Sequence, residues 1–302
     1  MKEKVSVLMC IYNEDIPTLK KAIYSIIQQT YKSIELIIVV DDPERKDVVL
    51  FLDDLEQDIP IRYSVNERNV GLAKSLNVGL LQCSGNYIAR MDADDISSLD
   101  RIEKQMVLLK DNAYDIVGGY IQLIDENDNI IRERKDFPIK CESIREMLLF
   151  RNCIPHPTWL VRKELYQELQ GYRNIKAVED YDFLIRAAKA GAKFGMLPEI
   201  CLKYRINSNG ISRNNLAYQM LIMRVIQNQY KSGIQEERII NSFADEHPDD
   251  LKRNIKFYYL TKKKNKTIYN IIVIAFSRQF YREINRRIRA FIILWKDRYG
   301  HC

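Results

Sequence analysis

Metal-binding and disulfide-forming residues are sparse in this 302-residue sequence. Its three histidines form no paired pattern, and no two of its six cysteines form a Cys-x-x-Cys pair. These spacings argue against a zinc site and against a disulfide framework. The first residues, MKEKVSVLMC, lack the pattern of a cleavable signal peptide. Together these features predict a protein of the reducing cytoplasm.

Long hydrophobic runs and glycine-rich phosphate loops are missing as well. The longest apolar runs, IIVIAF (271–276) and AFIILW (290–295), fall short of the roughly 18 to 20 residues of a membrane-spanning helix. No Gly-x-Gly-x-x-Gly motif follows a predicted strand, which argues against a dinucleotide-dependent oxidoreductase. The hydrophobic content of 46% is enough for one large α/β domain and an accessory region.

Charge is distributed unevenly along the chain, although the formal net charge is +6. Residues 251–302 hold fourteen Lys or Arg and two acids, a net charge of +12, which leaves −6 for residues 1–250. In this basic tail, cations alternate with apolar and aromatic blocks, as in interfacial helices that bind anionic lipids. We expect peripheral binding to the inner face of the cell membrane rather than nucleic-acid binding. Helix packing or a homodimer is the alternative.

Alternating strand and helix patterns dominate the first hundred residues. Four apolar runs, at 5–12, 34–42, 59–67 and 86–92, are typical of buried strands. Because short connections join them to helical patterns, we expect a mostly parallel sheet with right-handed crossovers. Further along, the pattern predicts two strands around a turn at 126–129, and a closing strand pair over 192–206.

Polar side chains follow the ends of the first four strands. Ligands gather beyond the carboxyl ends of parallel strands, so we expect these side chains to line a single crevice. They are Tyr12, Asn13, Asp41, Asp42, Asn66, Glu67, Asp92, Asp94 and Asp95.

The stretch MDADD (91–95) places three carboxylates within four positions. Such close like charges raise one another's pKa, so a cation, hydrogen bonds or solvent must compensate them. One interpretation is a solvated loop in which Asp95 caps a helix. The other is a metal site, because Mg²⁺ and Mn²⁺ take one or two carboxylates together with substrate phosphates. The position directly after a buried strand favours the metal site, with Asp95 as a helix-start or hydrogen-bonding residue.

Four motifs occur in order: VSVLMCIYNE, ELIIVVDD, NVGLAKSLNVGL with SGNYIARMDADD, and VEDYDFLIRAAKAG. Together they resemble the motifs of family 2 inverting glycosyltransferases with the A-type fold, over residues 4–210. The resemblance implies an α/β fold with a mostly parallel central sheet flanked by helices. It also implies a catalytic domain over 1–212, with a nucleotide-binding half (1–97) and an acceptor-binding half (98–212). A basic helical extension covers 213–302.

The nearest pattern is that of bacterial enzymes that build capsule, O-antigen or exopolysaccharide. It implies transfer of a hexosyl or N-acetylhexosaminyl group from a nucleotide-diphosphate donor, expected to be a UDP-sugar, with Mn²⁺ or Mg²⁺. The implied acceptor is a glycan or a polyprenyl-linked sugar. A sugar-phosphate nucleotidyltransferase is one alternative, although IYNEDIPTL after the first strand lacks the expected glycine-rich, basic loop. An inactive scaffold of the same fold is the other.

On the nucleotide side, the resemblance assigns Tyr12 to a position near the base. A core tyrosine is the alternative. Asp42, with Asp41 beside it, matches the carboxylate that accepts a hydrogen bond from the N–H of the base. A helix-capping role is the alternative. Pro43 stands where relatives have a flexible glycine, which puts the path of that loop in doubt.

On the phosphate side, the resemblance makes Asp94 the direct metal ligand and assigns Asp92 to the ribose or to a water-mediated contact. Lys74 matches a position that can reach base or phosphate, against a solvated helix face. Arg205 matches the basic residues that reach the diphosphate late in the domain.

On the acceptor side, Asp180 matches the general base that takes the proton of the acceptor hydroxyl, and Glu179 precedes it. A helix-capping pair is the alternative. His156 and Trp159 match positions near the acceptor entrance, with structural packing as the alternative for each. Asp182 is expected on the surface of the same helix.

Overall fold

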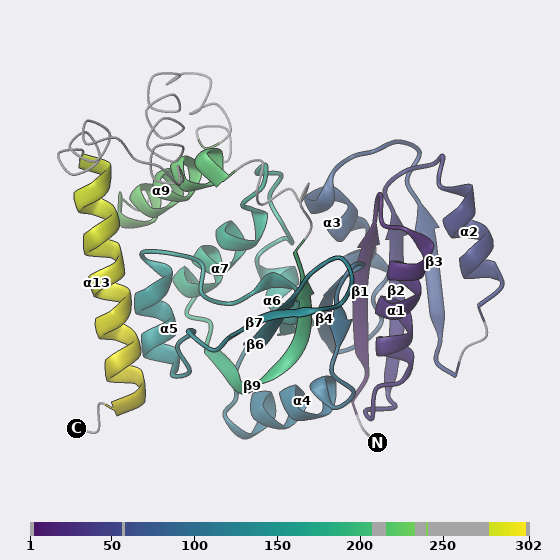
Figure 1. Cartoon of the computed structure of the whole chain (residues 1–302), viewed down its shortest axis with the longest axis horizontal. Helices are drawn as coiled ribbons and strands as arrows, with labels where there is room; N and C mark the ends of the chain where they lie inside the picture. The colour runs from purple at the N-terminus through teal and green to yellow at the C-terminus, as the bar shows by residue number, and fades with distance from the viewer. Residues whose placement is uncertain (1–2, 56–57, 207–215, 233–239, 241–277, 300–302) are drawn as a thin grey trace.

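The computed structural model describes residues 3–55, 58–206, 216–232, 240 and 278–299 (Figure 1). Residues up to Arg205 form a nine-stranded sheet with helices on both faces. The strands are β1 Val5–Ile11, β2 Ile34–Val40, β3 Ile61–Val65, β4 Tyr87–Asp92, β5 Ile96–Ser97, β6 Ile116–Ile124, β7 Ile130–Arg134, β8 Leu160–Arg162 and β9 Phe194–Arg205. The helices are α1 Ile16–Ile27, α2 Lys46–Asp53, α3 Leu72–Gln82, α4 Arg101–Asp111, α5 Cys141–Leu148, the 3-10 helix η1 His156–Thr158, α6 Lys163–Glu168, α7 Glu179–Lys189, α9 Leu216–Ser232 and α13 Arg278–Tyr299.

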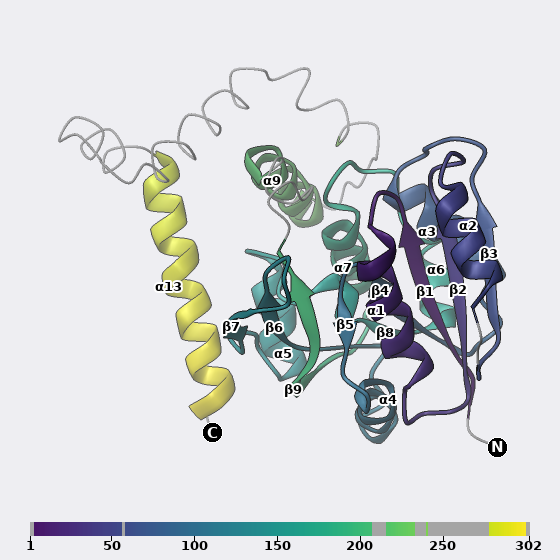
Figure 2. The same ribbon diagram turned by 45° about the vertical axis from the view of Figure 1, so that its right-hand side comes forward.

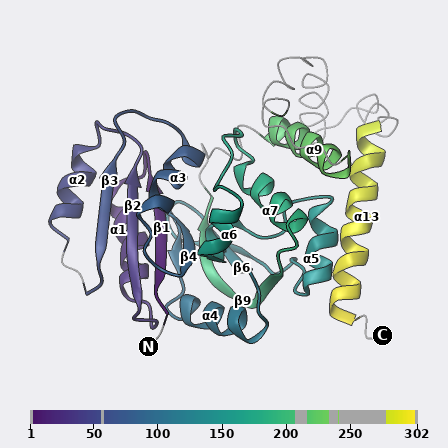
Figure 3. The same cartoon turned by 180° about the vertical axis from the view of Figure 1, so that it is seen from behind.

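The parallel part of the sheet confirms the predicted arrangement of the first four strands. β1 pairs in parallel with β2 and β4, and β2 pairs in parallel with β3. α1 covers one face and α3 covers the other, as Figures 1 and 3 show from opposite sides. The carboxyl ends of these strands meet at one edge, where the strand order reverses between β1 and β4. Ligand sites of open α/β sheets lie at such a reversal.

The second part of the sheet is mixed. β8 lies antiparallel between β4 and β6, and β6 pairs in parallel with β9 (Figure 2). The two strands predicted around the turn at 126–129 are β6 and β7. The predicted closing pair is instead one strand, β9, because the pairing jumps from Leu197 to Ile200 on the β9 side. A bulge at Pro198 and Glu199 absorbs the proline that would otherwise end a strand.

Two helices of the C-terminal part pack on the preceding part of the fold. Gln227 on α9 donates a hydrogen bond from Nε2 to the Tyr181 hydroxyl of α7, at 2.9 Å. α13 lies against α5 (Figures 1 and 3), and its Asp297 accepts hydrogen bonds from the N–H groups of Ile139 and Lys140, both at 2.8 Å. Within the described ranges, no helix is long and apolar enough to cross a membrane. Residues 251–277 of the basic tail, which include IIVIAF, lie outside the described residues.

Candidate active site

The acidic turn after β4 gathers three carboxylates at the sheet edge. Asp92, Asp94 and Asp95 each offer one oxygen atom, and these oxygens lie within 4.8 Å of one another. No helix starts at Asp95, because β5 follows directly. Its Oδ1 instead accepts a hydrogen bond from the backbone N–H of Arg205 at 2.8 Å. Of the two roles expected for Asp95, helix start is therefore wrong and hydrogen bonding is confirmed.

Two arginines compensate part of this negative charge. Arg90 lies two residues before Asp92 on β4, is almost completely buried, and donates from Nη2 to Asp92 Oδ1. Its Nε and Nη1 have no hydrogen-bond partner among the described residues. Arg205 closes the turn from β9, because its Nε donates to the backbone carbonyl of Asp94 at 2.9 Å.

The side chain of Arg205 is fixed by several contacts with the protein. The side chain is buried, and Nη1 donates to the backbone carbonyl of Asp125 at 2.9 Å. Its Nη2 lies 2.6 Å from Asp128 Oδ1 in an ion pair. These contacts make Arg205 a support of the acidic turn. A direct contact with phosphate stays a prediction.

The donor set of the turn fits a hard divalent cation. All three side chains offer oxygen, the ligand type that Mg²⁺ and Mn²⁺ prefer. Asp95 Oδ2 is buried and has no hydrogen-bond partner among the described residues. Burial, followed by the negative charge of Asp92, raises the pKa of Asp94 to about 7. A cation would relieve this cost of ionising Asp94, so the turn is suited to hold one, and the predicted ligands Asp94 and Asp92 stay a prediction.

Asp41 organises the predicted nucleotide side. Its Oδ1 accepts hydrogen bonds from Asn66 Nδ2 at 2.8 Å and from the Val70 N–H at 2.9 Å. Its Oδ2 accepts from the Gly71 N–H at 2.8 Å. Gly71 has a positive φ of 86° and lies at the start of α3, so it turns the chain where Asp41 holds it. With both oxygens bound to the protein, Asp41 fixes this loop.

Tyr12 and Asp42 remain accessible beside Asp41. Tyr12 is 46% exposed, so it is not a core tyrosine. Asp42 Oδ1 accepts a hydrogen bond from the Glu44 N–H at 3.0 Å. The loop that contains Pro43 is tied down by Arg45, which donates to the carbonyl oxygens of Tyr12 at 2.9 Å and Glu14 at 2.7 Å.

Lys74 is exposed on the first turn of α3. Its place at this edge is compatible with both alternatives, a contact with the donor and a solvated helix face.

The predicted acceptor side is built on the first turn of α7. Asp180 is partly buried, and its Oδ2 accepts a hydrogen bond from Asn152 Nδ2 at 2.7 Å. Burial raises the pKa of Asp180 to about 6, and the charge of Asp92 adds to the rise. Burial and the neighbouring charge of Asp180 raise the pKa of Glu179. Because Asp92 affects the ionisation of Asp180, the acidic turn and α7 face a common region.

His156 and Trp159 belong to an aromatic cluster behind this region. Trp159 is fully buried, and its Nε1 donates to the Ile154 carbonyl at 3.0 Å. The His156 ring lies 4.5 Å from that of Trp159, and Nε2 is 2.8 Å from the Tyr172 hydroxyl. Burial, with the positive charge of Arg90, holds the pKa of His156 well below its usual range. The burial of both side chains fits the packing alternative, and their contact with an acceptor stays a prediction.

Asp182 is not a surface residue, contrary to expectation. It is fully buried and forms ion pairs with Arg173 and Arg186. Arg186 also donates to the carbonyl oxygens of Leu169 at 2.6 Å and Gly171 at 2.8 Å. The helical pattern could not reveal this role, because the partner segment 169–173 packs over the helix only in the folded chain.

Comparison with known proteins agrees with this geometry. The family model described as "Glycosyl transferase family 2" matches residues 6–173. The chain belongs to glycosyl transferase family 2. An uncharacterized glycosyltransferase of Methanocaldococcus jannaschii is 36% identical over 216 residues, which cover 70% of this chain and 74% of that protein. The O-antigen biosynthesis glycosyltransferase WbnJ of Escherichia coli is 32% identical over 219 residues, which cover 72% of this chain and 85% of that protein.

Solved structures show that this family 2 glycosyltransferase has the predicted A-type fold. S. aureus TarS in complex with UDP-GlcNAc superposes with a TM-score of 0.62 at 15% identity, covering 99% of this chain and 92% of that chain. The mannosyltransferase PcManGT from Pyrobaculum calidifontis, in complex with GDP-Man and Mn²⁺, gives a TM-score of 0.60 at 15% identity, covering 100% and 89%.

Sequence reasoning missed two residues of this family 2 glycosyltransferase site. Arg90 could have been found, because side chains two apart on a strand share a face, and this places Arg90 beside Asp92. Asn152 carries no comparable signal. It lies 28 positions from Asp180 in an irregular segment, and only the fold brings the two side chains together.

Proposed function

We propose that this family 2 glycosyltransferase transfers a sugar from a UDP-sugar to an acceptor hydroxyl, with inversion, in bacterial surface polysaccharide synthesis. The observation that carries the proposal is a partly buried carboxylate, Asp180, that is held by Asn152 and lies near enough to the acidic turn for the charge of Asp92 to raise its pKa. The similarity to an O-antigen enzyme and to a fold that binds UDP-GlcNAc supports the pathway and the donor.

The donor half would hold the nucleotide diphosphate at the strand ends. Tyr12 offers an exposed ring for the base, and Asp42 offers a carboxylate for its N–H. A divalent cation held by the acidic turn would neutralise charge on the departing diphosphate. The rigid support of the turn by Arg205 and Arg90 keeps its carboxylates in place.

The acceptor half would supply the base for a single displacement. Asp180 accepts the proton of the attacking hydroxyl, while the new bond to the anomeric carbon forms on the side opposite the leaving diphosphate. Asn152 Nδ2 and the Tyr181 N–H each bind one oxygen of Asp180 at 2.7 Å, which fixes its direction. Glu179, His156 and Trp159 are proposed to shape the acceptor side.

The pH dependence of turnover should report this base. Asp180 accepts a proton only as a carboxylate, so kcat should fall below about pH 6, the pKa to which burial raises it. The fall should approach tenfold per pH unit. Turnover measured between pH 4.5 and 8.5 at saturating UDP-sugar and Mn²⁺ checks this. A profile that stays flat down to pH 4.5 would contradict the assignment.

Donor and metal binding should appear together as thermal stabilisation. A ligand at about 100 times its Kd adds about 2.7 kcal/mol, or roughly 5 to 10 °C in Tm. We expect this shift with UDP and Mn²⁺ together, and a much smaller shift with UDP and EDTA. The Asp94→Asn variant should lose the additional Tm shift that Mn²⁺ gives with UDP. The Asp111→Asn variant, changed on the exposed end of α4, should keep that shift. A full shift of the Asp94→Asn variant would remove Asp94 from the metal site.

A panel of nucleotide sugars, tested for binding by thermal shift and for turnover by UDP release, separates this function from the alternatives. A transferase releases UDP from the donor when an acceptor is present, whereas a nucleotidyltransferase would require a sugar phosphate and a nucleoside triphosphate. An inactive scaffold would bind donor without turnover. We propose a polyprenyl-linked or glycan acceptor, and a cytoplasmic enzyme that works at the inner membrane face. A homodimer and the 212/213 division of the chain also remain proposals.

A further inference from the structure

The outward face of α13 carries an exposed apolar stripe. Phe291 is 68% exposed, although it lies on a helix packed against the catalytic body. The stripe follows steps of four, three, one and three residues, which places its members on one helix face. They are Ile284, Ile288, Phe291, Ile292 and Trp295. Ala290, Ile293 and Asp297 are buried toward α5, so the stripe points away from the protein.

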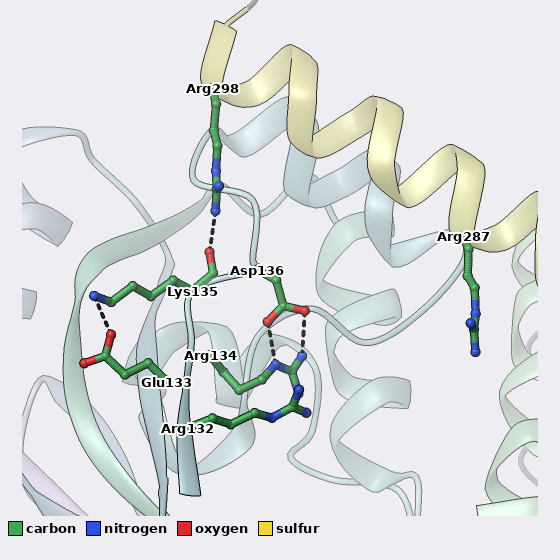
Figure 4. A pocket seen from close by; sticks show the side chains of 7 residues that line it. All are labelled: Arg132, Glu133, Arg134, Lys135, Asp136, Arg287 and Arg298. Carbon is green, nitrogen blue, oxygen red and sulfur yellow. Dashed lines mark hydrogen bonds and ion pairs between the residues drawn. The ribbon is translucent and has the colours of Figure 1, made fainter. Parts of the chain in front are cut away.

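A basic groove adjoins the helix that carries this stripe, with Arg287 and Arg298 of α13 in its lining (Figure 4). It has a volume of about 810 Å³ and is formed by β7, the two residues after it, and α13. Five cations and two acids line it, a local net charge of +3. They are Arg132, Arg134, Lys135, Arg287, Arg298, Glu133 and Asp136.

The contacts within the groove join segments far apart in the sequence. Arg298 on α13 donates from Nη2 to the carbonyl of Lys135 at 2.6 Å. Arg134 pairs with Asp136, and Lys135 pairs with Glu133 at 2.7 Å. The two acids thus engage two of the five cations, and the groove keeps an excess of positive charge.

We propose that the apolar stripe and the basic groove form one docking surface for a bilayer that contains anionic phospholipids. The stripe would enter the boundary between head groups and acyl chains, while the groove binds lipid phosphates. Arginine forks bind phosphate oxygens in pairs, and an interfacial helix combines such cations with Ile, Phe and Trp. This surface includes residues 132–136 of the catalytic domain, and it rests on the proposed function only for the location of the acceptor.

Charge selects this occupant over a second copy of the chain. A two-fold dimer across the stripe would bring the same cations of both copies together, because each patch faces itself. An anionic membrane instead matches the groove by charge and the stripe by polarity. Docking through α13 would also fix the orientation of the active site, because α13 is tied to α5 through Asp297.

Flotation of the full-length protein with phospholipid vesicles tests the proposal. We expect recovery with phosphatidylcholine vesicles that contain phosphatidylglycerol, and little with phosphatidylcholine alone. Arg132→Glu/Arg298→Glu should weaken the partition coefficient at least about 25-fold, since each of the two lost cations contributes roughly fivefold near an anionic surface. Ile288→Ser/Phe291→Ser should weaken it comparably.

Matched variants control for charge and hydrophobicity. Lys20→Glu/Lys32→Glu makes the same charge change at α1 and the loop after it, on the opposite side of the molecule from α13 (Figure 1). Leu50→Ser/Leu81→Ser removes two other exposed apolar side chains. Both controls should float like the parent.

Several outcomes would overturn the proposal. One is equal recovery of the protein with neutral and with anionic vesicles. Another is recovery of both test variants at the level of the parent. A third is a dimer of the parent in solution that Ile288→Ser/Phe291→Ser dissociates. A further outcome against the proposal is that inorganic phosphate stabilises the parent, that Arg132→Glu/Arg298→Glu abolishes this stabilisation, and that no vesicles are bound. That outcome would assign the groove to free phosphate. The UDP and Mn²⁺ thermal shift is measured on the same samples. If that shift fails while flotation succeeds, the proposed function is lost and the docking surface stands.

Discussion

Replacing Asp180 with Asn should lower kcat by about 10³-fold, because general-base catalysis contributes about 10² to 10⁴ to a rate. Asn keeps the size of the side chain but can accept only one of the two hydrogen bonds, from Asn152 or from the Tyr181 N–H, and it cannot take a proton. Affinity for the UDP-sugar should change little, since Asp180 lies on α7 and the donor is assigned to the strand ends. Steady-state kinetics and the UDP thermal shift measure the two effects separately.

Asp111→Asn is the matched control, because it makes the same chemical change on an exposed part of α4. Its turnover should equal that of the parent. The acid limb of the pH profile should also disappear from the residual activity of Asp180→Asn. Parental turnover of Asp180→Asn would show that another group takes the proton. A loss of UDP binding in step with turnover would instead assign Asp180 to the donor site.

Asp182→Ala should destabilise the protein by about 3 to 5 kcal/mol, because removing one partner leaves buried charge uncompensated. Arg173 and Arg186 both pair with this buried carboxylate. For a chain of this size, about 4 kcal/mol corresponds to roughly 8 to 16 °C in Tm. Thermal unfolding followed by circular dichroism measures the change.

Asp111→Ala should shift Tm by less than about 2 °C, since exposed substitutions stay within about 0.5 kcal/mol. If Asp182, Arg173 and Arg186 serve only stability, replacing all three with Leu or Met should recover part of the lost free energy of unfolding. A Tm for Asp182→Ala within 2 °C of the parent would show that solvent reaches the arginines in solution.

The parallel half of the fold could be predicted because its signal is local. Continuous apolar runs such as those of β1 and β2 are needed where both faces of a strand are buried, and short connections limit the topology. The position of the acidic turn could also be predicted, because the turn directly follows the apolar run of β4 in the sequence. The continuity of strand β9 could not be predicted, because a proline such as Pro198 normally ends a strand. Only the pairing with β6 shows the bulge.

The roles of several charged residues depended on partners distant in sequence. Asp41 and Asp42 are adjacent in sequence, but only Asp41 meets the N–H groups of Val70 and Gly71. Arg205 meets the carbonyl of Asp94, and Asp182 meets Arg173 and Arg186. Sequence patterns predict which face a side chain occupies, but they do not state which segment packs over that face.

The bond between Arg205 and Asp95 has a consequence for synthesis on the ribosome. The two residues are 110 positions apart, so the acidic turn is translated well before its support. At about 5 to 20 residues per second, the interval is roughly 5 to 20 s. During that time the nascent chain carries three clustered carboxylates without the strand that braces them. Competence to bind a nucleotide sugar should therefore arise late, in one step, once β9 has left the exit tunnel.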